Sequence, residues 1–395
     1  MKAGTIKIPE EYLAGYDRAH ARDAEFAEAY VRHTTIGDPI GDETAADLAE
    51  FPADRVHEIL TRAMANPAKL PPEAPASLGR FMEESMEVPA WFDEEATRIS
   101  SRAFLRNSDV VLAGLVAGSI VEGFATLIST SFRIRGRVMS MGVRRLKQNG
   151  LHLLESYLPG GVLPLSDGWR LSLRIRLVHA RSRLLIGQSE EWEEERYGLP
   201  VSAATLSLAA AAFSGRLMRH VARLGGDFSR EEREAYVHVW RYSAILLGIP
   251  QEVTFRDEAG ALNVFDVAKL CEPPPGDDAI IMANSIINSA PIVIGVTESA
   301  ERRKIAALAY RISRGLIGGS LADALRYPGK GDGLAVQGFA FRNRLARAVF
   351  GVIPAIRKNR DLNRTNQLMD FVDLGRTELS YALPTATHDE ESSDW

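Results

Sequence analysis

Residues 229–250, SREEREAYVHVWRYSAILLGIP, decide the fold class because they encode one complete helix with both of its ends. Ser229 and Glu232 have the spacing of a capping box, in which each side chain binds the backbone N–H of the other residue. Apolar residues then recur every three or four positions, and a glycine and a proline follow, as is typical where a helix ends. We therefore predict a helix over residues 230–247.

The same helical periodicity continues along the chain in both directions. Further helices are predicted over residues 96–105, 110–132, 144–158, 169–186, 203–224, 299–316 and 341–350. Only a short piece, residues 252–255, suggests a strand, and no internal repeat is present. The sequence therefore predicts an all-α protein.

Composition along the chain suggests three parts. Residues 1–87 read as an N-terminal helical arm, and residues 88–383 as one large helical domain. Residues 384–395 are acidic and polar, a composition typical of disorder, so we expect a disordered tail.

The overall composition describes a globular chain and excludes several kinds of site. The 395 residues carry a net charge of −5 and are 46% hydrophobic, so neither general disorder nor a nucleic-acid partner held by bulk positive charge is expected. A single cysteine, Cys271, excludes an internal disulfide and the multi-cysteine sites of zinc and iron–sulfur clusters. A protein-bound transition metal must therefore be held by His, Asp or Glu.

Motifs of several common enzyme classes are absent. The sequence has no Gly-x-Gly-x-x-Gly after a strand, no Walker loop, no Gly-x-Ser-x-Gly and no His-Glu-x-x-His. No histidine has a glutamate three residues before it, as a ferritin-like di-iron site requires.

The sequence contains little evidence of a secretory signal or of a membrane-spanning helix. The first residues lack the apolar segment of a secretory signal, so we expect a cytoplasmic protein. Residues 110–132 carry a single charge, Glu122, and are long enough to span a bilayer. Three glycines and the position of Glu122 favour a core helix instead, and we expect no integral membrane span.

The predicted helix over residues 169–186 contains the most specific candidate site. Small and apolar side chains share one face with His179, and Arg176 and Arg183 flank it at helical spacing. This pattern suits an imidazole that meets a flat apolar cofactor, with guanidinium groups near acidic substituents at the cofactor's edge. The alternative is a core histidine beside a solvated basic face that pairs with the acidic residues 190–195.

The charge around this helix is strongly positive. Residues 131–183 hold 11 basic side chains and two acidic ones, an excess of nine positive charges in a chain of net charge −5. Such an excess indicates an anionic partner.

A series of short motifs then runs through the chain in a specific order. It comprises Val88-Pro-Ala-Trp-Phe-Asp93, Gly136-Arg-Val138 with Arg144-Arg145, Leu177-Val-His-Ala180 with Arg183, Trp192, Tyr197-Gly-Leu-Pro-Val201, Phe213-Ser214, residues 231–240 and Leu246-Leu-Gly-Ile249. The series resembles the latex-clearing protein/MpaB oxygenase family. The resemblance implies a globin-like core of packed helices that encloses one b-type haem. It also implies enzymes that use O2 to cleave carbon–carbon double bonds in polyisoprene or a farnesyl chain.

The resemblance also implies roles for single residues. His179 matches the proximal haem ligand, and therefore the metal ligand. Arg176 and Arg183 match the arginines beside it, which we assign to contacts with the haem edge and propionates. Arg145 matches the arginine on the distal side.

The distal side departs from the family pattern. Rubber-cleaving members have Lys and Thr three and four residues after the arginine, whereas this chain has Gln148 and Asn149. Lys147 comes one residue early, which is about 100° away on a helix. The Thr expected in the helix after Pro200 is absent and is replaced by the alanine run over residues 209–212. Arg145, Gln148 and Asn149 are expected to donate hydrogen bonds to bound O2.

Glu122 is the remaining candidate catalytic residue. Burial in an apolar helix would raise the pKa of its carboxyl, as suits acid/base chemistry. The alternative is a structural carboxylate paired with an arginine.

Together with these residues, the resemblance implies a b-haem-dependent oxygenase that uses O2 on an apolar, isoprenoid or lipid-like substrate, with oxidative cleavage of a C=C bond as one outcome. A non-catalytic haem-binding or haem-sensing protein of the same fold is the alternative, because the distal residues are altered. A third hypothesis keeps the fold without haem, with the helices enclosing a lipid.

Overall fold

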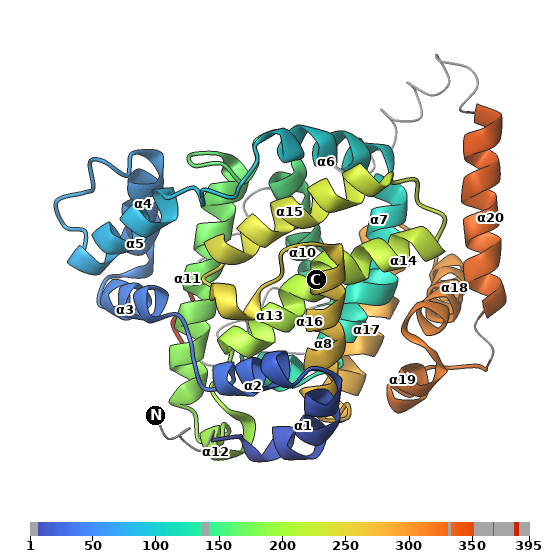
Figure 1. The fold of residues 1–395 in the computed structure, drawn as a ribbon, viewed down its shortest axis with the longest axis horizontal. Helices are drawn as coiled ribbons and strands as arrows, with labels where there is room; N and C mark the ends of the chain where they lie inside the picture. The colour runs from blue at the N-terminus through green and yellow to red at the C-terminus, as the bar shows by residue number, and fades with distance from the viewer. Residues whose placement is uncertain (1–6, 136–141, 331–332, 351–365, 367–382, 387–395) are drawn as a thin grey trace.

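The fold consists of packed helices, as predicted. The computed structural model describes residues 7–135, 142–330, 333–350, 366 and 383–386, and within these ranges the chain forms helices, turns and loops but no strand (Figure 1). Residues 136–138 of the motif series and the predicted tail beyond residue 386 lie outside the described residues.

The N-terminal part is helical and packs directly on the rest of the protein. Its helices are α1 (Glu10–Arg22), α2 (Ala24–His33), α3 (Pro39–Leu48), α4 (Ala53–Ala65) and α5 (Ala76–Met86). Helix α1 contacts α16 (Glu258–Cys271), and α3 contacts α11 (Asp167–Gly187). Figure 1 shows these blue helices along the left and lower edges of the molecule. Leu60 and Phe81 belong to the same apolar core as the central helices, so the arm completes that core.

The central and C-terminal helices make up the rest of the described fold. In chain order they are α6 (Glu95–Arg106), α7 (Ser108–Gly114), the π-helical turn η1 (Leu115–Ser119), α8 (Ile120–Phe124), α9 (Ile128–Arg135), α10 (Gly142–Tyr157), α11, α12 (Glu194–Tyr197), α13 (Ala203–Ala211), the π-helical turn η2 (Ala212–Arg216), α14 (Leu217–Arg223), α15 (Arg230–Leu246), the 3₁₀ turn η3 (Gln251–Val253), α16, α17 (Asp277–Val293), α18 (Ser299–Ile317), α19 (Gly319–Ala324) and α20 (Gly333–Phe350). Helix α15 packs on α6, and α10 packs on α17 and α11.

The helix predicted over residues 230–247 is confirmed as α15. Both bonds of its capping box are present: the Ser229 hydroxyl accepts from the Glu232 N–H at 3.1 Å, and the Glu232 carboxylate accepts from the Ser229 N–H at 2.8 Å. The chain leaves the helix through Gly248, whose φ of +79° is in the left-handed region that glycine adopts readily. Complete capping signals therefore located this helix to within one residue.

Three sequence predictions are wrong in detail. The helix predicted over residues 341–350 begins eight residues earlier, at Gly333 of α20. Residues 110–132 form α7, η1, α8 and α9 instead of one helix, with a break at residues 125–127. At the break, the Thr126 hydroxyl donates to the Gly123 carbonyl at 2.6 Å, and the Leu127 N–H donates to the Glu272 carboxylate at 3.1 Å. These side-chain bonds satisfy backbone groups that a continuous helix would have paired. Residues 252–255 begin in the 3₁₀ turn η3 rather than in a strand.

A membrane span is not evident in the described part of the chain. No single helix there is both long enough and apolar enough to cross a bilayer. The pair formed by α6 and the run Ser108–Phe124 passes by length and composition, but it is bent by 84°.

Candidate functional site

A cavity lies among α8, α9, α10, α11, α13, η2 and α15, beside the predicted ligand His179. Its empty volume is about 1510 Å³, which includes the part that opens to solvent. Most of the wall is apolar, with aromatic side chains contributed by Phe124, Phe132, Phe213 and Trp240. A large apolar space with a few polar groups is the usual form of a small-molecule site.

His179 contributes its imidazole to the cavity wall from α11. Burial, and after it the positive charges of Arg183 and Arg145 with the neighbouring His152, lower the pKa of His179 to about 3. The imidazole is therefore neutral near pH 7, the form that binds metals. Its Nδ1 is buried and has no hydrogen-bond partner among the described residues.

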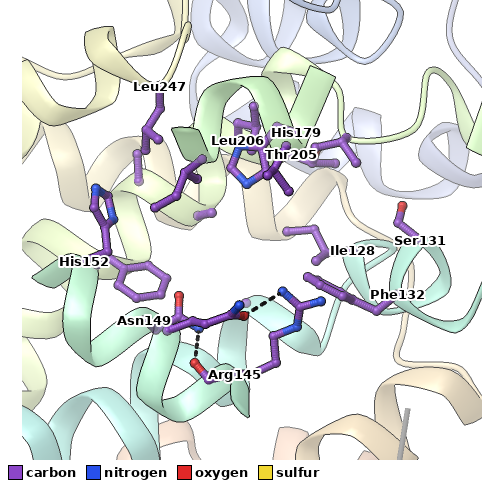
Figure 2. Close-up of a pocket in the computed structure, with 18 of the residues that line it drawn as sticks. Ile128, Ser131, Phe132, Arg145, Asn149, His152, His179, Thr205, Leu206 and Leu247 are labelled. Atoms are coloured by element: carbon purple, nitrogen blue, oxygen red, sulfur yellow. Dashed lines mark hydrogen bonds between the residues drawn. The ribbon is translucent and has the colours of Figure 1, made fainter. Parts of the chain in front are cut away.

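Arg145, Gln148 and Asn149 lie on the cavity wall formed by α10, and Figure 2 shows Arg145 and Asn149 across the cavity from His179. An Arg145 guanidinium N–H donates to Gln148 Oε1 at 3.2 Å, and the Asn149 amide donates to the Arg145 carbonyl at 2.8 Å. The guanidinium also lies 4.3 Å from the centre of the Phe132 ring. The structure thus brings together His179 and the three predicted distal residues around one cavity.

The sequence analysis did not propose several polar residues of the wall, among them Arg144, His152 and Thr205. His152 lies one turn after Asn149 on α10, and its Nε2 is 3.0 Å from the Ser172 hydroxyl of α11. Burial lowers its pKa to about 4. Thr205 of α13, four residues before the alanine run, also lines the cavity, so the helix after Pro200 does supply a threonine to the wall. His152 follows Arg145 by seven residues and Asn149 by three, and residues at these spacings share one face of a helix. This spacing could have predicted that His152 lines the same cavity.

Arg176 and Arg183 bind protein carboxylates, contrary to the expectation that they face the cofactor. Arg176 is buried and donates to both oxygens of Asp38, at 2.6 and 2.8 Å, and to Glu84 at 2.8 Å. Arg183 pairs with Asp42 and donates to the Val201 carbonyl at 2.8 Å. Neither arginine lines the cavity. The physical reason is that α3 and the loop before it pack on this side of α11 and supply the two aspartates.

Glu122 forms a buried ion pair away from the cavity wall. Its carboxylate accepts from the Arg216 guanidinium at 2.8 Å and from His220 Nε2 at 2.9 Å. Burial by itself raises the pKa of Glu122, but the hydrogen bonds and charges of His220 and Arg216 outweigh it and lower the pKa to about 2. The expected raised pKa is therefore wrong, and the alternative of a buried carboxylate paired with an arginine is confirmed.

Protein carboxylates neutralise much of the basic excess. Besides Arg176 and Arg183, Arg133 pairs with Glu191 and Asp278. Arg144 and Arg145 are the two basic side chains that line the cavity. The buried Nε of Arg144 has no hydrogen-bond partner within the described part of the chain. Any anionic group in the cavity would therefore meet these two arginines of α10.

Comparison with known proteins places this chain in a family. A solved structure, "Structure of Latex Clearing Protein LCP in the closed state", superposes with a TM-score of 0.65 at 21% identity, over 86% of this chain and 90% of that one, which establishes a shared fold. The family "ER-bound oxygenase mpaB/B'/Rubber oxygenase, catalytic domain" matches residues 102–349. The chain belongs to this family, as its motifs predicted.

A curated relative supports the same assignment. The "Rubber oxygenase" of Streptomyces sp. (strain K30) is 28% identical over 219 residues, which cover 52% of this chain and 51% of that protein. The chain thus spans about half the length of the curated relative it matches.

The structure predicts that Glu122→Gln destabilises the fold. Loss of the carboxylate leaves Arg216 without its partner, and breaking a buried ion pair on one side costs roughly 3–5 kcal/mol. Urea unfolding followed by circular dichroism measures the change. Glu83→Gln, which alters an exposed glutamate of α5, is the control. Equal stability of Glu122→Gln and the control variant would contradict a structural role.

The low pKa of His152 predicts a loss of stability in acid. Because the folded-state pKa of about 4 lies below the ordinary 6.5, the unfolded chain binds more protons between these values. This contribution to stability is complete above about pH 6.5 and is lost as the pH falls towards 4. From about pH 7 to about pH 5 the free energy of unfolding should fall by about 2 kcal/mol through this histidine.

Urea titrations at the two pH values measure this effect. Between them, the free energy of unfolding of His152→Gln should fall by about 2 kcal/mol less than that of the wild type. His57→Gln removes an exposed histidine of α4 and serves as the control. The assignment to His152 is wrong if the two variants lose the same amount of stability in acid.

Proposed function

We propose that this protein is a haem-dependent oxygenase that uses O2 to oxidise an apolar, isoprenoid or lipid-like substrate, with cleavage of a C=C bond as the expected chemistry. The observation that carries the proposal is the neutral His179 imidazole in the wall of a large apolar cavity. Membership of the oxygenase family supports it, as does the relative named for action on rubber.

The residues present fit a b-type haem. A neutral imidazole whose Nδ1 lacks an internal hydrogen bond is suited to hold iron, and the aromatic side chains suit a flat apolar ring. His179 would hold the iron, and Arg144 and Arg145 would meet the acidic substituents. A bound haem would supply the iron at which O2 is activated.

The protein's own side chains would position the substrate and exclude water. Phe124, Phe213 and Trp240 offer apolar surface that an isoprenoid chain can bury, at roughly 25 cal/mol per Å² of apolar area. No carboxylate lines the cavity within the described ranges. The polar groups that remain, Arg145 foremost, are hydrogen-bond donors able to stabilise negative charge on oxygen in a low-dielectric space.

A second candidate function, haem binding without oxygenase activity, is favoured by one observation. Arg145 donates to the side-chain amide oxygen of Gln148, and the Asn149 amide donates to the Arg145 carbonyl, so part of the donor capacity of this wall is used within α10 itself. A distal wall whose donors are partly engaged in this way offers fewer hydrogen bonds to O2. The polarity of the distal side decides whether a haem binds O2 or activates it.

His179→Ala is expected to abolish stoichiometric haem binding. The purified wild-type protein, supplied with hemin, should show a Soret band that the variant lacks, because the iron has lost its protein ligand. His238→Ala changes a histidine of α15 outside the cavity and should keep the band. Full haem content in His179→Ala would refute the ligand assignment, and a wild-type protein that binds no hemin would refute both candidate functions.

Arg145→Ala is expected to slow oxidation while haem content is kept. Loss of one donor to developing negative charge lowers rates on the order of 100-fold or more. An oxygen electrode with squalene or β-carotene as substrate measures the rate, and haem absorbance measures occupancy. Arg98→Ala, which alters an exposed arginine of α6, is the control. Haem-loaded wild-type protein that consumes no O2 with any such substrate would favour the second candidate.

A further inference from the structure

Helix α20 carries an apolar stripe on its outward face. Leu334, Phe341 and Leu345 are 79%, 67% and 51% exposed, which is unusual for large apolar side chains. Their spacings of seven and four residues place them on one side of the helix, where Gly338 and Ala348 also lie. Figure 1 shows α20 at the edge of the molecule. The stripe therefore forms a continuous exposed apolar face.

The opposite face of α20 is packed on the protein, so the orientation of the helix is determined. Val336, Ala340 and Asn343 are buried, and the Asn343 amide donates to the Leu224 carbonyl at 3.0 Å. Helix α20 contacts α14 and α18. Helix α20 therefore has two apolar faces: one is buried against the protein, and the outward stripe is the other.

Positive charge borders the stripe. Arg342 and Arg344 are exposed and lie about 80° to either side of the apolar residues on a helical projection. The helix sequence contains three arginines and no Asp or Glu. The adjacent helix α18 exposes Leu308 together with Arg303, Lys304 and Arg311, against one exposed acid, Glu301.

We propose that α20 is an interfacial helix that binds this protein to the surface of an anionic membrane. An apolar face bordered by arginines is the pattern of helices that lie at the boundary between lipid headgroups and acyl chains. The arginine stems can lie along the apolar surface while their guanidinium groups bind lipid phosphates. Helix α20 would lie on the membrane rather than across it, because it carries three arginines and is not apolar enough to cross a bilayer. The proposal does not depend on the proposed function.

Sedimentation of the full-length protein with vesicles tests this proposal. Wild-type protein should sediment with vesicles of phosphatidylcholine and phosphatidylserine, and much less with phosphatidylcholine alone. Phe341→Asp/Leu345→Asp should lower the partition coefficient at least about tenfold through lost apolar burial. Arg342→Gln/Arg344→Gln should lower it roughly 30-fold, which corresponds to about 1 kcal/mol for each arginine.

A matched control tests whether vesicle binding requires the stripe on α20 or any exposed apolar side chain. Leu13→Asp alters a leucine of α1 that is 55% exposed and should bind vesicles as the wild type does. Circular dichroism melting should show that all of these variants remain folded. Failure of the wild type to bind anionic vesicles overturns the proposal, as does an equal loss of binding in Leu13→Asp. Dimerisation through the stripe without vesicle binding also overturns it.

A site-specific fluorophore reports whether α20 itself enters the lipid. The native Cys271 is buried, so a polarity-sensitive thiol label would react with Phe341→Cys in preference. Its emission should shift to the blue when anionic vesicles are added, and a label at Leu13→Cys should not shift. A label at Phe341→Cys that is already shielded before vesicles are added would show that the chain itself covers the stripe, and this overturns the proposal.

Discussion

The buried pairing of Arg176 with Asp38 is the constraint on which the candidate site depends. It joins α3 to α11 in the chain's interior, and α11 is the helix that carries His179. The turn after α15 meets them at the same point, because a Cβ at Gly248 would lie 2.4 Å from an Asp38 oxygen and 2.7 Å from Arg176 Nε. Only glycine fits there, and its φ of +79° is also what ends α15. Three helices distant in sequence thus converge on one ion pair. Removal of Arg176 would leave the buried Asp38 carboxylate without its charged partner, and removal of Asp38 would leave Arg176 with Glu84 alone.

This pairing also determines the polarity of the cavity. Asp38 and Asp42 draw the guanidinium groups of Arg176 and Arg183 towards the N-terminal helices, so the wall around His179 stays apolar. The arginine and amide side chains of the cavity come instead from α10, which packs against α11. One helix therefore presents the neutral imidazole, and its neighbour presents the hydrogen-bond donors. The N-terminal arm contributes to the site indirectly, as the source of the carboxylates that hold α11 in place.

Prediction from the sequence succeeded where a signal was local. The capping box at Ser229 and the periodicity around His179 are contained within a few turns of helix, and both helices were located closely. The breaks within residues 110–132 were not predicted, because they depend on Glu272, which lies 145 residues away and binds the Leu127 N–H. Glu122 was assigned a raised pKa for the same reason: its partners Arg216 and His220 are 94 and 98 residues distant.

The sequence by itself determined the helical class, the family and the helix faces that carry His179 and Arg145, because periodicity and short motifs express local backbone geometry. Only the tertiary structure decided which charges face the cavity and which pair with one another. A guanidinium group binds whichever carboxylate or cofactor the packing of distant helices brings within hydrogen-bond distance, and spacing along one helix carries no information about that partner. For the same reason, the packing of α20, and not its composition, decided that Phe341 and Leu345 face outward.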